Sequence, residues 1–294
     1  MTRSIFEFLW GNQPIQAIQQ FFGLGLTWFF VPLSLLGSHE GAAAVTALAL
    51  WLRGRRLAYA LMGMIVFALA TDMLLWQLVG VQRPSAPAIW VYANAPVSSF
   101  PSGHVVTASV VWGLLAVFGC IWKRVAVVIV LGVMLSRLYL GMHYLGDVLG
   151  GVVIGLLLLS IYVRLWPMIA TWFAHRSLLF FVILGVCGPL AVLPFTLITD
   201  RAWVAFGSAF GGALGMLVEY HYVRYEPDQA SLAQQAAKVL AGLGVAGMLM
   251  VVLVVANSSV LTAGVFACVA LWLTLGAPAL FSWLGLAGRA AQRG

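Results

Sequence analysis

Residues 145–164 read LGDVLGGVVIGLLLLSIYVR, a run in which Asp147 and Arg164 are the only charged side chains. A helix needs about 20 predominantly apolar residues to cross the hydrocarbon core of a bilayer, so this stretch predicts a transmembrane helix. The whole chain has the same character, because 63% of its 294 residues are hydrophobic and 8% are charged. Soluble domains carry about 25% charged residues. The composition therefore predicts an all-α, polytopic membrane protein.

Apolar runs of similar length recur along the chain and predict a bundle of about ten spans. These candidates lie at 17–37, 39–52, 57–80, 103–122, 125–141, 145–164, 178–199, 202–220, 239–256 and 260–287. We expect three regions. Residues 1–38 hold an interfacial helix and the first span, residues 39–166 form a catalytic membrane core, and residues 167–294 add four spans of unknown role.

The distribution of positive charge predicts the orientation. If the N-terminus is cytoplasmic, all 15 lysines and arginines except Arg83, Arg137 and Arg201 fall at cytoplasmic ends. This asymmetry is typical of inner-membrane proteins and places both termini inside. Membrane topology then accounts for the net charge of +7, so nucleic acid is not an expected partner. No removable signal peptide is expected at the N-terminus.

Ionisable residues left on the outer side mark a candidate site. Within the first six spans they are nearly all accounted for by Arg83, His104, Arg137, His143 and Asp147. Polar groups near lipid are costly, so their retention indicates function. We expect this site to face the periplasm or the cell exterior.

Several of these residues are suited to binding a phosphate. Ser102 is a candidate N-cap, and Gly103 begins the following helix, whose unpaired N–H groups attract anions. Arg83 and Arg137 can hold phosphate oxygens with two parallel hydrogen bonds each. The combination predicts an anion site. No carboxylate cluster with metal-ligand spacing is visible in the sequence, and no cofactor is expected.

Two histidines and a carboxylate add the reactive groups. His143 and Asp147 are four residues apart and share one face if helical. The carboxylate can then orient the imidazole and stabilise its charged form. His104 is left as the proton donor to a leaving oxygen.

Each group taken alone also fits a structural role. His104 can cap a helix, and the pair His143 and Asp147 can tie a turn to a helix. Arg83 and Arg137 can anchor span ends at the interface. A functional site is favoured because all five groups converge on one side of the membrane.

Three segments together resemble the type-2 phosphatidic acid phosphatase superfamily. Its pattern is Lys, six residues, Arg-Pro; then Pro-Ser-Gly-His; then Ser-Arg, five residues, His, three residues, Asp. The second element is complete at 101–104, and the third is complete from Ser136 to Asp147. The first element keeps Arg83 and Pro84, but Trp76 occupies the lysine position.

The resemblance implies a role for each matched residue. Arg83, Ser102, Gly103 and Arg137 would bind the phosphate. His143 would attack phosphorus, oriented by Asp147, and His104 would protonate the leaving group. We expect support from Asp72, Trp76, Gln77, Pro84, Pro101 and Ser136. Trp76 is expected to organise an arginine, with Gln77 as the competing replacement for the lysine, and Asp72 is expected to pair with Arg83 or Arg137.

The implied activity is metal-independent hydrolysis of a lipid phosphate through a phosphohistidine. The candidate substrates are undecaprenyl diphosphate, which we favour, phosphatidate, phosphatidylglycerophosphate and lipid A phosphates. Two alternatives remain open. One is a lipid phosphotransferase that uses the same site, and the other is a protein that binds or translocates lipid phosphates without catalysing a reaction. The sequence does not predict an oligomeric state.

Overall fold

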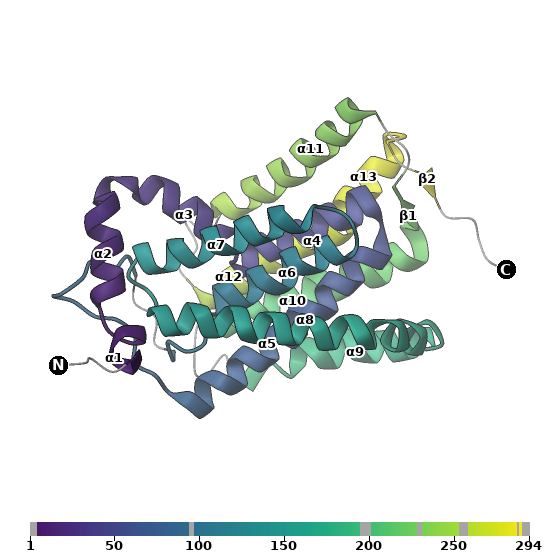
Figure 1. Ribbon diagram of the computed structural model, residues 1–294. Coiled ribbons are helices and arrows are strands. Elements are labelled where there is room, and N and C mark those ends of the chain that lie inside the picture. Colours follow the sequence, from purple (N-terminus) through teal and green to yellow (C-terminus); the bar gives the residue numbers. More distant parts are fainter. Residues whose placement is uncertain are drawn as a thin grey trace. The chain divides into compact units, whose positions relative to one another are not determined.

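The computed structural model describes residues 5–93, 97–194, 201–227, 231–252, 258–286 and 288–289, and its long elements are all helices (Figure 1). The chain divides into two compact units. The first comprises Met1–Val45 and Tyr59–Ile169, and the second comprises Thr46–Ala58 and Ala170–Gly294. The three regions expected from the sequence remain a prediction.

The first unit holds all of the candidate site residues. Its helices are α1 (Ile5–Leu9), α2 (Gln13–Phe22), α3 (Thr27–Leu35), α6 (Gly103–Val117) and α7 (Lys123–Tyr139), with most of α5 (Arg55–Val79) and α8 (Leu145–Ala174) and the start of α4 (His39–Arg53). Helices α6 and α7 run side by side. Val105, Ala108, Val133, Leu138 and Val148 form a buried cluster between α6, α7 and α8. This apolar core holds the ends of the three helices that carry the site.

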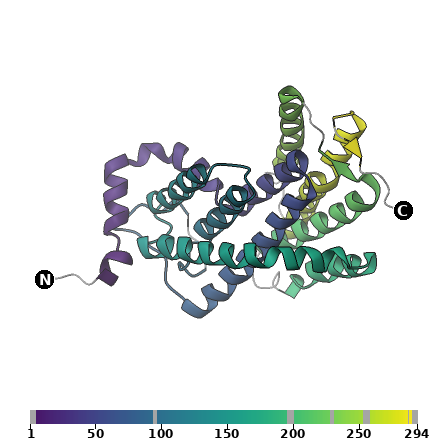
Figure 2. The same cartoon turned by 45° about the vertical axis from the view of Figure 1, so that its right-hand side comes forward.

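The first expected span, 17–37, is not one straight helix. Helix α2 ends at Gly23, which has a φ of 65°, and a short 3-10 turn η1 (Leu24–Leu26) precedes α3. The axis bends by 84° between Ile5–Phe22 and Leu24–Leu35. The bend is visible in both Figure 1 and Figure 2. Glycine tolerates positive φ without a steric penalty, so the chain can turn sharply there.

The N-terminal bend ties α2 to the loop that follows α5. Gln19 Nε2 donates to the carbonyl oxygens of Trp90 and Tyr139 at 2.8 and 2.9 Å, and Trp90 N donates back to Gln19 Oε1. Gln16 Nε2 donates to the Ala88 carbonyl at 3.0 Å. The two glutamine side chains thus supply hydrogen-bond donors to backbone carbonyls that no described helix or sheet satisfies.

The second unit is built on close helix packing. It contains α9 (Leu178–Leu190), α10 (Arg201–Val218), the π-helical turn η3 (Glu219–Val223), α11 (Leu232–Val251), α12 (Ser259–Leu271), the π-helical turn η5 (Trp272–Gly276) and α13 (Ala277–Trp283), plus paired strands β1 (Tyr225–Glu226) and β2 (Gly288–Arg289). Gly207 and Gly211 lie against the backbones of Ala263 and Ala267. The glycines at these positions of α10 therefore form a packing stripe, because small residues let helices approach closely.

A buried polar group links the start of α5 to the end of α10 within the second unit. Arg55 Nε lies 3.3 Å from Glu219 Oε1, which accepts the backbone N–H of Tyr225 at 2.9 Å. The Tyr225 hydroxyl donates to the Trp51 carbonyl at 2.6 Å. These contacts give Glu219 a structural role.

The number of spans differs from the expectation. Within the described residues, five helical segments are long and apolar enough to cross a membrane, or six if the bent N-terminal pair counts as one span. Helices α4, α6 and α7 have 15, 15 and 17 residues. At 1.5 Å per residue these helices reach roughly 22–26 Å, short of a hydrocarbon core about 30 Å thick. About ten spans is therefore not confirmed, and residues 195–199, 253–256 and 287 of the expected spans lie outside the described residues.

Candidate active site

The loop after α5 is closed by its own backbone and by Arg83. Ser99 N donates to the Val81 carbonyl at 2.8 Å, and Val81 N donates to Ser98 Oγ at 3.0 Å. Arg83 Nε donates to the Val97 carbonyl at 3.1 Å, and its Nη2 lies 3.4 Å from the Ser98 carbonyl. Arg83 thus fixes the part of the loop that leads into the Pro-Ser-Gly-His segment.

A tight turn between α7 and α8 presents His143. Gly141 has a φ of 64° and lies so close to the Trp90 carbonyl that a Cβ would collide with it. Met142 N donates to the Arg137 carbonyl at 3.1 Å, which keeps the turn attached to the end of α7. The Met142 carbonyl accepts Arg83 Nη1 at 3.1 Å, so the turn and the loop are joined beside the imidazole.

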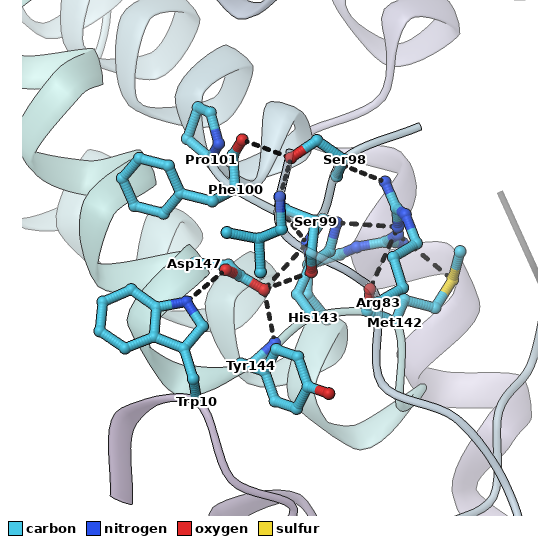
Figure 3. Close-up of polar contacts among 12 residues, drawn as sticks. Trp10, Arg83, Ser98, Ser99, Phe100, Pro101, Met142, His143, Tyr144 and Asp147 are labelled. Carbon is cyan, nitrogen blue, oxygen red and sulfur yellow. Dashed lines mark hydrogen bonds and ion pairs between the residues drawn. The ribbon is translucent and has the colours of Figure 1, made fainter. Parts of the chain in front are cut away.

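The partners of His143 define its tautomer (Figure 3). Nδ1 lies 2.9 Å from the backbone carbonyl oxygen of Ser99, which can only accept, so Nδ1 carries the hydrogen. Nε2 lies 3.4 Å from Arg83 Nη1, which can only donate. Nε2 therefore keeps a free electron pair, and it points toward a cationic donor.

Asp147 is oriented by three donors rather than by His143 alone. Oδ2 accepts the backbone N–H of Tyr144 at 2.8 Å and a short hydrogen bond from the Ser99 hydroxyl, while Oδ1 accepts Trp10 Nε1 at 3.1 Å. His143 Nδ1 is 3.7 Å from Oδ2. The expected His143–Asp147 pair is thus present. Ser99 lies between the two residues and makes a shorter contact with each of them than they make with one another.

Burial lowers the pKa of His143 from its ordinary value to about 4. The positive charges of Arg137 and Arg83 contribute to this decrease in pKa, while the neighbouring Asp147 carboxylate opposes it. An imidazole is uncharged well above its pKa. His143 is therefore neutral at physiological pH, in agreement with the partners of its two nitrogens.

The start of α6 lies beside Asp147. Ser102 occupies the N-cap position as expected, and its backbone N–H donates to the Asp147 carbonyl at 3.1 Å. The Ser102 side chain does not cap the helix; its Oγ is buried and has no partner among the described residues. Arg137, His143, His39 and Arg83 act electrostatically on His104, the second residue of α6. The helix end that we expected to bind an anion therefore lies within electrostatic range of Arg83, Arg137 and His143.

Arg137 is buried at the end of α7. Its Nη1 donates to Ser34 Oγ of α3 at 2.7 Å, and its Nη2 lies 3.2 Å from the sulfur of Met142. The Nε atom has no partner among the described residues. A buried guanidinium with an unused donor is suited to binding an anion.

Trp76 lies at the site, and its indole N–H binds the loop before α6 rather than either arginine. Its Nε1 donates to the Pro101 carbonyl at 3.0 Å, and a Cβ on Gly103 would lie 3.0 Å from its ring. Gln77, the competing candidate, is exposed. Because successive helical residues point in directions about 100° apart, only one of the two can face α6. Trp76 therefore supports the loop before α6.

The expected pairing of Asp72 with an arginine was wrong. Asp72 is buried, and within the described part of the chain neither of its oxygens has a hydrogen-bond partner. A Cβ on Gly103 would lie 3.2 Å from its Oδ2. Asp72 sits one turn before Trp76 on α5, so it faces the start of α6 and not the arginines.

The other supporting residues have local contacts. The Ser136 hydroxyl donates to the Val133 carbonyl of its own helix at 2.7 Å. Pro84 is buried directly after Arg83, and Pro101 supplies the carbonyl that Trp76 binds. None of these three contacts places a side-chain polar atom toward His143.

Sequence reasoning missed Ser99, Trp10, Ser34 and Met142. Ser99 lies three residues before Ser102 in a polar loop, and this proximity was the available signal. Trp10 and Ser34 contact residues 137 and 103 positions away. No local pattern reports contacts over such separations.

The comparisons with known proteins agree with this architecture. Residues 57–171 match the family model described as PAP2 superfamily, and residues 203–289 match the model described as PAP2 superfamily phosphatase, transmembrane extension. Together with the apolar helices, these matches define a multi-pass membrane protein. The chain belongs to the PAP2 superfamily and carries its transmembrane extension.

The individual relatives align with only part of the chain. Phosphatidylglycerophosphatase B of Escherichia coli and that of Shigella flexneri are each 38% identical over 99 residues, which is 31% of this chain and 32% of theirs. The alignment thus spans about a third of these curated relatives. The crystal structure of a transmembrane PAP2-type phosphatidylglycerolphosphate phosphatase from Bacillus subtilis is 22% identical, covers 54% of this chain and 85% of that one, and has a TM-score of 0.46. That similarity is too weak to compare the sites.

Proposed function

We propose that the protein is a lipid phosphate phosphohydrolase that works through a phosphohistidine on His143. The observation that carries the proposal is the free electron pair of Nε2, which lies 3.4 Å from Arg83 Nη1 while Nδ1–H is held by the Ser99 carbonyl. The proposed nucleophile therefore lies beside a cation that can stabilise the phosphoryl oxygens.

The reaction proceeds in two steps. Nε2 attacks phosphorus, the bond from phosphorus to the lipid oxygen breaks, and His104 gives that oxygen a proton. Water then attacks the phosphohistidine, His104 takes the proton from this water, and inorganic phosphate leaves. Arg83, Arg137 and the N–H groups at the start of α6 stabilise the charge on the equatorial oxygens.

The substrate class follows from the surroundings of the site. The catalytic residues sit at the ends of apolar helices in a multi-pass membrane protein, which favours a phosphate borne by a lipid. The curated relatives are named for phosphatidylglycerophosphate, so this lipid is the first substrate to test, with undecaprenyl diphosphate second. We place the protein in the inner membrane with the site facing outward.

The test is phosphate release by the purified full-length protein from a panel of lipid phosphates, with and without chelator. We expect release that survives chelation, is inhibited by vanadate and is absent from His143→Ala. Phosphatidylglycerol, a diester without a terminal phosphate, is the control substrate.

The alternatives give different products in the same assay. A phosphotransferase would release phosphate to water poorly and would label an added lipid acceptor from a radioactive donor. A binder or translocator would release none, and it has no need of an imidazole with a free Nε2. Wild-type rates in folded His143→Ala would overturn the mechanism.

A further inference from the structure

The N-terminal segment reaches the carboxylate of the catalytic pair. Trp10 follows α1 directly, and its Nε1 donates to Asp147 Oδ1 at 3.1 Å across 137 residues of sequence (Figure 3). Asp147 Oδ2 is used by Ser99 and by Tyr144 N. Trp10 thus binds the carboxylate oxygen that Ser99 and Tyr144 leave free.

The indole has a fitted place beside α8. A Cβ on Gly146 would lie 2.6 Å from two ring carbons of Trp10, so only glycine leaves room for the indole there. The ring centroid lies 6.3 Å from that of Phe100, which precedes Pro101, and Phe100 in turn fills the space over Gly150. Two glycines of α8 therefore make room for two rings that enclose Asp147.

Trp10 is also attached to a helix with apolar side chains on its surface. Its ring stacks on Phe6 with centroids 4.8 Å apart, and Ile5, Phe6 and Phe8 of α1 are exposed. Such a helix is suited to the boundary between lipid headgroups and acyl chains. Residues 1–56 lie outside both stretches matched to the family models.

Fixing a carboxylate requires donors to both oxygens. With Oδ1 held by Trp10, the carboxylate cannot rotate about its Cβ–Cγ bond without losing a hydrogen bond. Oδ2 is then kept directed at the Ser99 hydroxyl and, at 3.7 Å, at His143 Nδ1. Small errors in the orientation of such a group reduce catalytic rates disproportionately.

We propose that Trp10 is a positioning residue for the hydrolysis, and that it holds Asp147, and through Asp147 the imidazole of His143, in the reactive orientation. The inference rests on the proposed function. It extends the working site beyond the family core to the N-terminal segment that precedes it.

The test compares Trp10→Phe with Trp112→Phe in the full-length protein. Phenylalanine keeps an apolar ring but removes the N–H donor. Trp112 is the matched control, because its Nε1 donates to the Leu36 carbonyl at 2.8 Å and not to a site residue. We expect Trp10→Phe to lower kcat about tenfold with KM within about twofold of wild type, whereas Trp112→Phe leaves both within about twofold.

The kcat and KM measurements separate positioning from folding. Equal losses in the two variants, a wild-type kcat for Trp10→Phe, or a change confined to KM would each overturn the proposal. The proposed function is tested separately, by phosphate release in wild type and its loss in His143→Ala. The effect of Trp10→Phe is then interpreted only for the positioning role of Trp10.

A second measurement does not depend on turnover. The indole N–H resonance of Trp10, assigned by its absence from Trp10→Phe in detergent-solubilised, ¹⁵N-labelled protein, should move in Asp147→Ala. If wild type hydrolysed no lipid phosphate but this resonance moved, the proposed function alone would fail and the contact would stand. A resonance unaffected by Asp147→Ala would refute the positioning contact.

Discussion

Arg83 Nη1 lies 3.4 Å from His143 Nε2, and the same nitrogen donates to the Met142 carbonyl at 3.1 Å. The guanidinium is thus anchored by backbone carbonyls while it also faces the imidazole that we propose as the nucleophile. This arrangement places the charge before a substrate arrives, so little reorganisation is needed during the reaction.

Replacing Arg83 with lysine should therefore be severe. Lysine keeps the charge but cannot hold the Val97 and Met142 carbonyls and a phosphate with one planar group. We expect Arg83→Lys to lower kcat/KM by about a hundredfold or more, equivalent to roughly 2.7 kcal/mol. Steady-state phosphate release measures this, with exposed Arg56→Lys as the control. Activity within tenfold of wild type would show that the fork geometry of Arg83 is not needed.

The acid side of the pH profile should reflect His143. Its pKa is lowered to about 4, so attack by neutral Nε2 should persist below pH 6.5, the usual value for histidine. Single-turnover phosphorylation should fall only as the pH approaches 4. An acid limb centred at pH 6.5 or higher would contradict the burial of a neutral imidazole.

The same shift has a consequence for stability. Between pH 6.5 and about 4 the unfolded chain takes up a proton at residue 143 that the folded protein does not. The free energy of unfolding should therefore decrease as the pH falls through this window. Thermal unfolding of wild type and His143→Gln at several pH values checks this, and the variant should lose less stability on acidification.

Trp76 and Gln77 should differ clearly in their effects on turnover. Trp76→Phe removes the hydrogen bond to the Pro101 carbonyl that supports the start of α6, and we expect a loss of about tenfold in kcat. Gln77→Ala changes an exposed side chain and should stay within about twofold. A larger loss in Gln77→Ala would indicate that Gln77 replaces the family lysine.

Asp72 should be replaceable by its neutral isostere. An unpaired buried carboxylate is costly, and asparagine has nearly the same shape without the charge. Asp72→Asn should keep or raise the thermal midpoint, by about 2–4 °C for each kcal/mol gained. Asp147→Asn is the comparison, since its carboxylate accepts three hydrogen bonds. A drop as large as that of Asp147→Asn would mean that Asp72 is part of an essential polar contact.

The orientation of the site can be tested by labelling. Ala93, in the loop between Arg83 and Ser102, and Ala174, at the end of α8, are both exposed. In a variant without Cys120, Cys187 and Cys268, we expect Ala93→Cys to react with a membrane-impermeant thiol reagent in whole cells or spheroplasts. Ala174→Cys should react only after permeabilisation. The reverse pattern would place the site at the cytoplasmic face.

The sequence by itself determined the class of the fold and most members of the site. Apolar runs such as 145–164 require helices in a membrane, because unpaired backbone groups are too costly in lipid. Asp147 lies in the first turn of α8 and His143 in the turn just before that helix, so their short separation in sequence was sufficient to bring them together. These are local or compositional constraints, which periodicity reports directly.

Tertiary structure alone decided which contacts the site residues make. The Ser99 carbonyl binds His143 across 44 residues, and Trp10 binds Asp147 across 137. The face that α5 presents to α6 determined the neighbours of Asp72 and Trp76. The 84° bend at Gly23 brought the N-terminal segment to the loop of the site. Such contacts depend on how separate helices pack against one another, and helix packing is determined by the shapes of the buried surfaces rather than by spacing along the chain.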